Sequence, residues 1–156
     1  MTQFQELVGK RVKKIFMNED YLKFETDQGI VIYSVEGDCC SKSVFYDFIG
    51  VKKLLSGNEV KVIEKIDLHP SDIVVKKDDY GCEESTDKKS YQESIQVYGY
   101  RIVSIDPVLG EVSSVFSFRN YSNGYYGGYM EVETEEVVVL PEIFDDVIET
   151  AVTNKN

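Results

Sequence analysis

The chain has 156 residues, of which 42% are hydrophobic, and it carries 11 tyrosines and 8 phenylalanines. That is enough apolar side chain to build a core without disulfide or metal crosslinks, so we expect a single domain over residues 1–156. The formal net charge of −11 repels phosphate backbones, which disfavours direct nucleic-acid binding and favours a basic protein partner.

The sequence shows no sign of export or membrane insertion. Its apolar runs, such as residues 137–140, are far too short to cross a bilayer. The first residues lack the basic start and the apolar stretch of a secretory signal. Three cysteines, two of them adjacent, do not form a paired disulfide framework. We therefore expect a cytoplasmic protein.

The first half of the chain predicts strands followed by a short helix. Residues 11–35 hold three apolar runs separated by polar turns, which is typical of an antiparallel meander. Over residues 44–49 the apolar side chains recur at helical spacing, behind Ser41 and Ser43, which can cap a first turn. Residues 60–68 alternate as a fourth strand.

The second half predicts a loop and then more strands. Residues 69–94 are polar and form a long expected loop. Residues 95–105 and 112–119 flank an Asp-Pro and a Leu-Gly turn, which indicates a hairpin. Residues 129–133 alternate tyrosine or methionine with glutamate, as an exposed edge strand does.

The end of the chain predicts a second helix. Pro141 suits the first turn of a helix through Val147 and Ile148, and residues 150–156 are expected to fray. The expected fold class is therefore α+β. It has a mainly antiparallel β-sheet, a short helix after Cys40 and a C-terminal helix.

One cluster that can carry chemistry is Gly37-Asp38-Cys39-Cys40-Ser41. A thiol just before a helix start feels the positive end of the helix dipole, which lowers its pKa and favours a nucleophilic thiolate. A nucleophile also needs a base, and the sequence gives no position for its one histidine, His69. We expect the alternative, in which small residues let strand and helix pack closely.

A second cluster is Asn123-Gly124-Tyr125-Tyr126-Gly127-Gly128. Asn-Gly is a strong turn signal, and tyrosines on a loop offer apolar area and a hydroxyl at low entropic cost, as a binding loop requires. The alternative is a hairpin end whose tyrosines fold back onto the sheet. Neither cluster has the ligand spacing of a zinc site, a calcium loop or a phosphate loop, so we expect no metal and no cofactor.

Acidic charge is concentrated after residue 120. Residues 120–154 hold 8 acidic side chains and no basic one. Such a stretch can steer a basic partner towards tyrosine anchors, although the charge can also serve solubility alone. The residues expected to contact the partner are Tyr125, Tyr126, Glu131, Glu133, Glu135, Glu136, Asp145 and Asp146.

Three further segments accompany the two clusters: Tyr98-Gly99-Tyr100, Phe118-Arg119-Asn120 and Phe24-Glu25-Thr26-Asp27. With these segments and both clusters, the chain resembles a family of uncharacterised small domains from bacteriophages and their bacterial hosts. The resemblance covers about residues 10–133, interrupted at 69–94. It implies a compact, strand-rich α+β domain. It brings no catalytic residue, and residues 134–156 fall outside it.

We expect a non-enzymatic, phage-type binding protein that inhibits a host nucleic-acid-targeting defence enzyme, such as a nuclease, in the manner of an anti-CRISPR protein. This step rests on association. One alternative is a protein that binds a small molecule such as a nucleotide signal, with Arg101 and Arg119 in a local basic pocket. Another is a thiol-dependent enzyme centred on Cys39 or Cys40.

Overall fold

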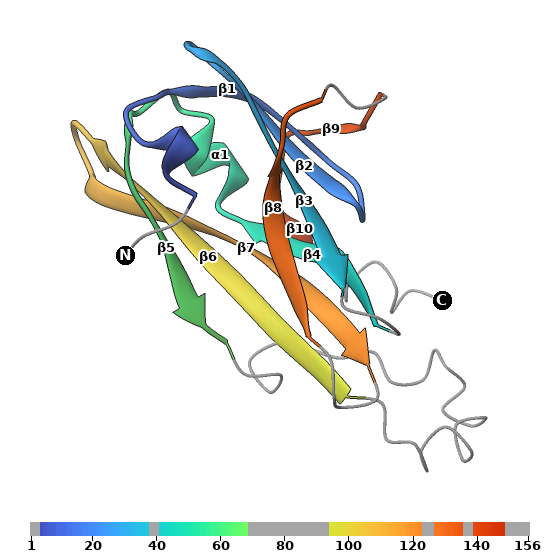
Figure 1. Ribbon diagram of the computed structural model, residues 1–156. Coiled ribbons are helices and arrows are strands. Elements are labelled where there is room, and N and C mark those ends of the chain that lie inside the picture. Colours follow the sequence, from blue (N-terminus) through green and yellow to red (C-terminus); the bar gives the residue numbers. More distant parts are fainter. Residues whose placement is uncertain (1–3, 38–40, 69–93, 123–126, 136–138, 149–156) are drawn as a thin grey trace.

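The computed structural model describes residues 4–37, 41–68, 94–122, 127–135 and 139–148. This part of the chain is nearly all β, with two five-stranded antiparallel sheets and one short α-helix (Figure 1). The elements are a 3-10 turn η1 (Gln5–Leu7), β1 (Val12–Met17), β2 (Tyr21–Thr26), β3 (Gly29–Gly37), β4 (Lys42–Ile49), α1 (Val51–Leu54), β5 (Val60–Asp67), β6 (Ser94–Asp106), β7 (Gly110–Ser122), β8 (Gly128–Glu133), β9 (Glu142–Ile143) and β10 (Val147–Ile148).

The chain visits both sheets twice. The first sheet has the strand order β8-β3-β2-β1-β9, and the second has the order β10-β4-β7-β6-β5. The chain leaves the first sheet after β3, builds β4 to β7, and returns with β8. The two shortest strands then close one edge of each sheet, so each sheet is completed by residues close to the C-terminal end of the sequence.

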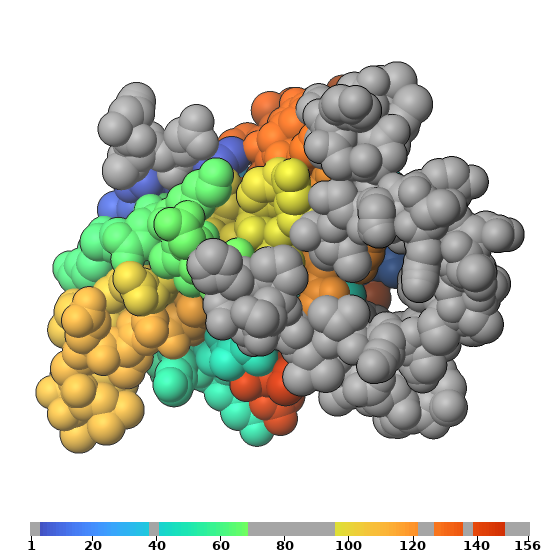
Figure 2. Space-filling view, turned by 90° about the horizontal axis from the view of Figure 1, so that it is seen from below, coloured from blue at the N-terminus to red at the C-terminus, as the bar shows by residue number. Residues whose placement is uncertain are grey.

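One apolar core lies between the sheets. Phe24 of the first sheet meets Phe48 and Phe116 of the second, with ring centroids 6.1 Å and 6.5 Å away. All three rings are fully buried, and each contributes roughly 1.5–3 kcal/mol of burial free energy. The β6–β7 hairpin extends beyond this core, and its projecting tip carries the exposed side chains of Val108 and Leu109 (Figure 2).

The α+β prediction was wrong, first at the expected helix after Cys40. Residues 44–49 belong to β4, which pairs with β7. The register shifts between Phe45, which lies opposite Phe118, and Phe48, which lies opposite Phe116. This bulge inserts an extra residue, so two side chains three positions apart both face the core. The bulge therefore reproduces the spacing of a helix inside a strand.

The expected C-terminal helix was also wrong. Residues 142–143 pair with β1 as β9, and residues 147–148 pair with β4 as β10. The carbonyl of Pro141 accepts a hydrogen bond from the Met17 amide at 3.0 Å, which fixes the segment along β1. Pairing with the edges of the two sheets therefore outweighs the local helix signals in this C-terminal segment.

The remaining expected elements were confirmed. The meander is β1 to β3, the fourth strand is β5, the hairpin is β6 and β7, and β8 is an edge strand. A helical turn after Gly50 is α1. Most of the expected polar loop lies at residues 69–93, outside the described residues, and so does the expected frayed tail.

Candidate functional site

Five segments that are distant in the sequence meet where β3 ends, and we call this place the sheet junction. It joins the ends of β3 and β8 in the first sheet to β4, β6 and β7 in the second. Its residues are Glu36, Gly37, Ser41, Ser43, Tyr98, Asn120, Gly127 and Gly128.

The centre of the sheet junction is Asn120, whose side chain is 0% exposed. Its Nδ2 donates to Ser43 Oγ at 3.0 Å and to Ser41 Oγ at 3.2 Å. Ser43 Oγ donates onward to the Glu36 carbonyl at 2.8 Å, and Ser41 Oγ donates to the Gly127 carbonyl at 3.3 Å. One amide thus links β7 to β3 and to the start of β8, and each buried hydroxyl has both an incoming and an outgoing bond.

Gly128 is required where β8 approaches this network. A Cβ at Gly128 would lie 2.0 Å from Ser43 Oγ and 2.8 Å from Asn120 Nδ2. The Gly128 amide also donates to the Tyr98 hydroxyl at 3.4 Å. The Gly-Gly pair therefore allows close backbone approach, which is a structural role.

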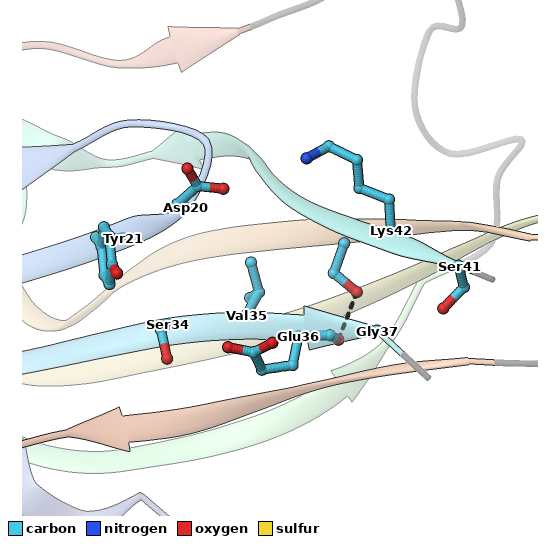
Figure 3. Close-up of a pocket in the computed structure, with 9 residues that line it drawn as sticks. Asp20, Tyr21, Ser34, Val35, Glu36, Gly37, Ser41 and Lys42 are labelled. Carbon is cyan, nitrogen blue, oxygen red and sulfur yellow. Dashed lines mark hydrogen bonds between the residues drawn. The ribbon is translucent and has the colours of Figure 1, made fainter. Parts of the chain in front are cut away.

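A polar cavity of about 300 Å³ opens beside the sheet junction, between the β1–β2 turn, the end of β3 and the start of β4. Figure 3 shows the Lys42 ammonium and the Asp20 carboxylate extending into the space on one side of β3, and Ser34 and Glu36 on the other. Its lining offers two carboxylates, one ammonium and four hydroxyls. This chemistry suits a small polar molecule rather than an apolar one. The lining residues are Asp20, Tyr21, Ser34, Val35, Glu36, Gly37, Ser41, Lys42 and Ser43.

Three of the acidic side chains form a patch on the outer face of the first sheet, which we call the acidic edge: Glu36, Glu131 and Glu133. Glu131 lies opposite Ser34 in the β3–β8 register, and Tyr129 lies opposite Glu36. Within the described part of the chain, these three carboxylates take no part in the ion pairs, which lie elsewhere. Glu135 follows β8 and is exposed. The acidic edge therefore keeps its negative charge uncompensated.

Asp145 and Asp146 lie apart from the acidic edge and have partners in the chain. Asp146 Oδ1 accepts hydrogen bonds from the amides of Gly50 and Val51 at 2.9 Å and 3.0 Å, which caps α1. Asp145 pairs with Lys52 at 3.6 Å. Both follow β9, which lies at the opposite edge of the first sheet from β8, four interstrand steps or about 19 Å away. The expected contact residues thus divide into two groups.

Several predicted residues lie outside the described residues. They are Cys39, Cys40, His69, Tyr125, Tyr126 and Glu136. Thiol chemistry and the tyrosine anchors therefore stay predictions. Among the residues that are described, no three histidine, cysteine or acidic side chains group as metal ligands, and no helix has the length and hydropathy of a membrane span.

The two arginines of the expected basic pocket share the outer face of the second sheet but have different surroundings. Arg101 donates to Glu64 Oε2 through Nη2 at 2.6 Å and through Nε at 2.9 Å. Arg119 is buried near the C-terminal end of β7. Arg101 lies opposite Val115, so the two side chains start about 13 Å apart along the strand direction.

Sequence reasoning missed the junction role of Asn120 and Ser43. The usable signal was an asparagine on the face of the strand that also carries Phe116 and Phe118, because asparagine is depleted in strands unless its amide has partners.

The comparisons with known proteins identify the family. Residues 5–132 match the domain of unknown function DUF7448, and the chain belongs to that family. An uncharacterized protein of Acanthamoeba polyphaga mimivirus is 35% identical over 134 residues, which cover 80% of this chain and 88% of the viral protein. No solved structure matches the chain. The expected resemblance to an uncharacterised family is confirmed, and the bacteriophage origin stays a prediction.

Proposed function

We propose that this protein is a non-enzymatic binding protein of viral type that engages a basic surface of a host protein through β8. The observation that supports this most is the acidic edge, with uncompensated carboxylates on an edge strand. Tyr129 on the same face is 45% exposed and adds apolar area beside the charge.

The geometry of β8 suggests how the contact forms. Among the described strands β8 pairs only with β3, so its other edge can offer backbone N–H and C=O groups to a partner strand. Glu131 and Glu133 share one face and are spaced by about 7 Å, which is two residues of a strand. Backbone pairing then supplies affinity, and the glutamates supply steering and partner choice.

The partner class follows from the charge. Host enzymes that act on nucleic acids carry basic grooves for phosphate backbones, and a carboxylate-bearing strand can occupy such a groove. The viral relative fits a role in virus–host conflict. Inhibition of a nucleic-acid-targeting defence enzyme, in the manner of an anti-CRISPR protein, is the specific form of this proposal.

The test compares two triple charge reversals that change the net charge equally. The first is Glu131→Lys, Glu133→Lys and Glu135→Lys, on and after β8. The matched control reverses three exposed acids elsewhere, Glu19, Asp67 and Glu111.

A host protein captured from nuclease-treated lysate is purified, and its affinity for each variant is measured at low and at moderate salt. We expect the β8 variant to lose at least tenfold in affinity, the control to lose little, and binding to weaken as salt rises. Equal affinities for the β8 variant and the control would refute the proposal.

A second candidate function is binding of a small polar molecule in the cavity of Figure 3. The observation that favours it is a cavity of about 300 Å³ whose lining includes the charged residues Asp20, Glu36 and Lys42, a volume at the lower end for ligand sites. Native mass spectrometry of the purified protein checks it, with an Asp20→Asn, Lys42→Met variant as the comparison. If the measured mass of the wild-type protein equals the mass of the polypeptide alone, the small-molecule function is refuted.

A further inference from the structure

Arg119 is a buried charge, and two of its guanidinium nitrogens have no hydrogen-bond partner. Its side chain lies on the outer face of the second sheet and is 2% exposed. The guanidinium carbon lies 3.6 Å from the centroid of the Tyr46 ring, and its Nε and Nη2 have no hydrogen-bond partner. The ion pairs of the described residues use Arg11, Lys52, Lys61 and Arg101 instead.

Arginine side chains carry a positive charge in proteins. An uncompensated buried charge is strongly unfavourable, and a ring stack offsets only a small part of that cost. The flanking residues in the register are Val44 and Val97, which offer no acceptor side chain. An anion at Arg119 would remove the penalty.

A second unused donor lies on the same face. Ser117 precedes Arg119 by two residues, so strand alternation points both side chains to one side of β7. Ser117 is 2% exposed and its Oγ has no partner. The two side chains thus offer hydrogen-bond donors without partners, and their Cα atoms lie about 7 Å apart. One donor is cationic, so the pair suits an oxyanion.

We propose that Arg119, stacked on Tyr46 and assisted by Ser117, binds the oxyanion of a ligand, either a carboxylate or a phosphate. The stack fixes the plane of the guanidinium, and its N–H edge forms the fork that oxyanions accept in bidentate fashion. Water is excluded there, so each charge-assisted bond is stronger than at the surface. This site lies on the second sheet, is independent of the acidic edge, and falls within the family domain.

The experiment follows thermal unfolding of the full chain in inorganic phosphate, in sodium acetate and in sodium chloride at equal ionic strength. We expect an oxyanion to raise Tm beyond the chloride control, by about 5–10 °C at roughly a hundred times its Kd. A response to phosphate alone assigns a phosphate ligand, and a response to acetate assigns a carboxylate. A wild-type Tm that follows ionic strength only would overturn the proposal.

Two variants locate the response. Arg119→Met keeps the length of the side chain without its charge, and we expect it to lose the oxyanion response while matching or exceeding the wild-type Tm in chloride. Arg119→Lys keeps the charge without the fork, and we expect an apparent Kd at least tenfold weaker.

Arg101→Met is the control, because that guanidinium is already paired with Glu64, and its response should equal that of the wild type. An unchanged response in either Arg119 variant, or its loss in the Arg101 control, contradicts the assignment.

Discussion

Replacing Gly128 by alanine tests the sheet junction directly. The new Cβ would lie 2.0 Å from Ser43 Oγ, 2.8 Å from Asn120 Nδ2 and 3.0 Å from the Glu36 carbonyl, so the Ser43 side chain must move. Moving it breaks its bonds to Asn120 and to Glu36. Overpacking costs about 1–3 kcal/mol and each of the two net hydrogen bonds about 0.5–1.5 kcal/mol, so we expect Gly128→Ala to destabilise by about 2–6 kcal/mol.

The assay is urea unfolding followed by far-UV circular dichroism, since the chain has no tryptophan. Gly127→Ala is the matched control, because its Cβ would meet only the ends of the Tyr98 and Gln96 side chains, at 2.9 Å and 3.3 Å. We expect that control to cost about 1 kcal/mol or less.

A double-mutant cycle then isolates the contact. Ser43→Ala removes the atom that the new Cβ would strike, so the double variant should be at least 1 kcal/mol more stable than the sum of the two single changes. An unfolding free energy of Gly128→Ala within about 0.5 kcal/mol of the wild type would refute the reasoning. Strict additivity with Ser43→Ala would refute it as well.

Three further predictions concern caps and protonation, each measured as the free energy of unfolding in urea. Asp146→Ala should destabilise by about 1 kcal/mol through loss of the α1 cap, whereas Asp145→Ala loses an exposed ion pair worth about 0–1 kcal/mol and an exposed hydrogen bond from the Asp146 amide. Burial, and then the nearby Glu6 carboxylate, raise the pKa of Tyr33, so stability should fall as pH rises above about 10, where only the unfolded chain releases this proton, and Tyr33→Phe should flatten that slope. Hydrogen bonds from the Leu109 and Val108 amides and from Asn58 lower the pKa of Asp106, so stability should fall as pH drops below about 4, and Asp106→Asn should weaken that dependence.

Strand positions were predictable where one face is buried and local turns set the pairing. The β1–β2–β3 meander and the β6–β7 hairpin have this character, with apolar alternation and turn residues close in sequence. The helix prediction for residues 44–49 was wrong because the bulge in this strand lies opposite β7, which is more than 60 residues away in the sequence. The helix prediction for residues 142–148 was wrong because this segment pairs with the edges of β1 and β4, and no local sequence pattern reveals those edges.

The candidate site was predictable only in part. The sequence located the acidic residues and the glycine pair, because charge and turn propensity are local properties. It could not show that Asp146 faces α1 while Glu131 lies on an outer sheet face, since that separation comes from strand order. Nor could it show that Arg119 is buried, because an arginine in a strand is ordinarily exposed.

The structural and the binding interpretations of the tyrosine-glycine cluster are compatible within β8. Gly127 and Gly128 bring the start of the strand against Ser41 and the rest of the sheet junction, while Tyr129, Glu131 and Glu133 lie on the outer face. The sheet junction thereby fixes where the edge of β8 lies relative to the second sheet. If β8 binds a partner strand, Gly128→Ala should weaken binding more than Gly127→Ala does, although neither change removes an acidic side chain. Equal affinities for the two variants, with both chains folded, would show that the edge of β8 is not the binding surface.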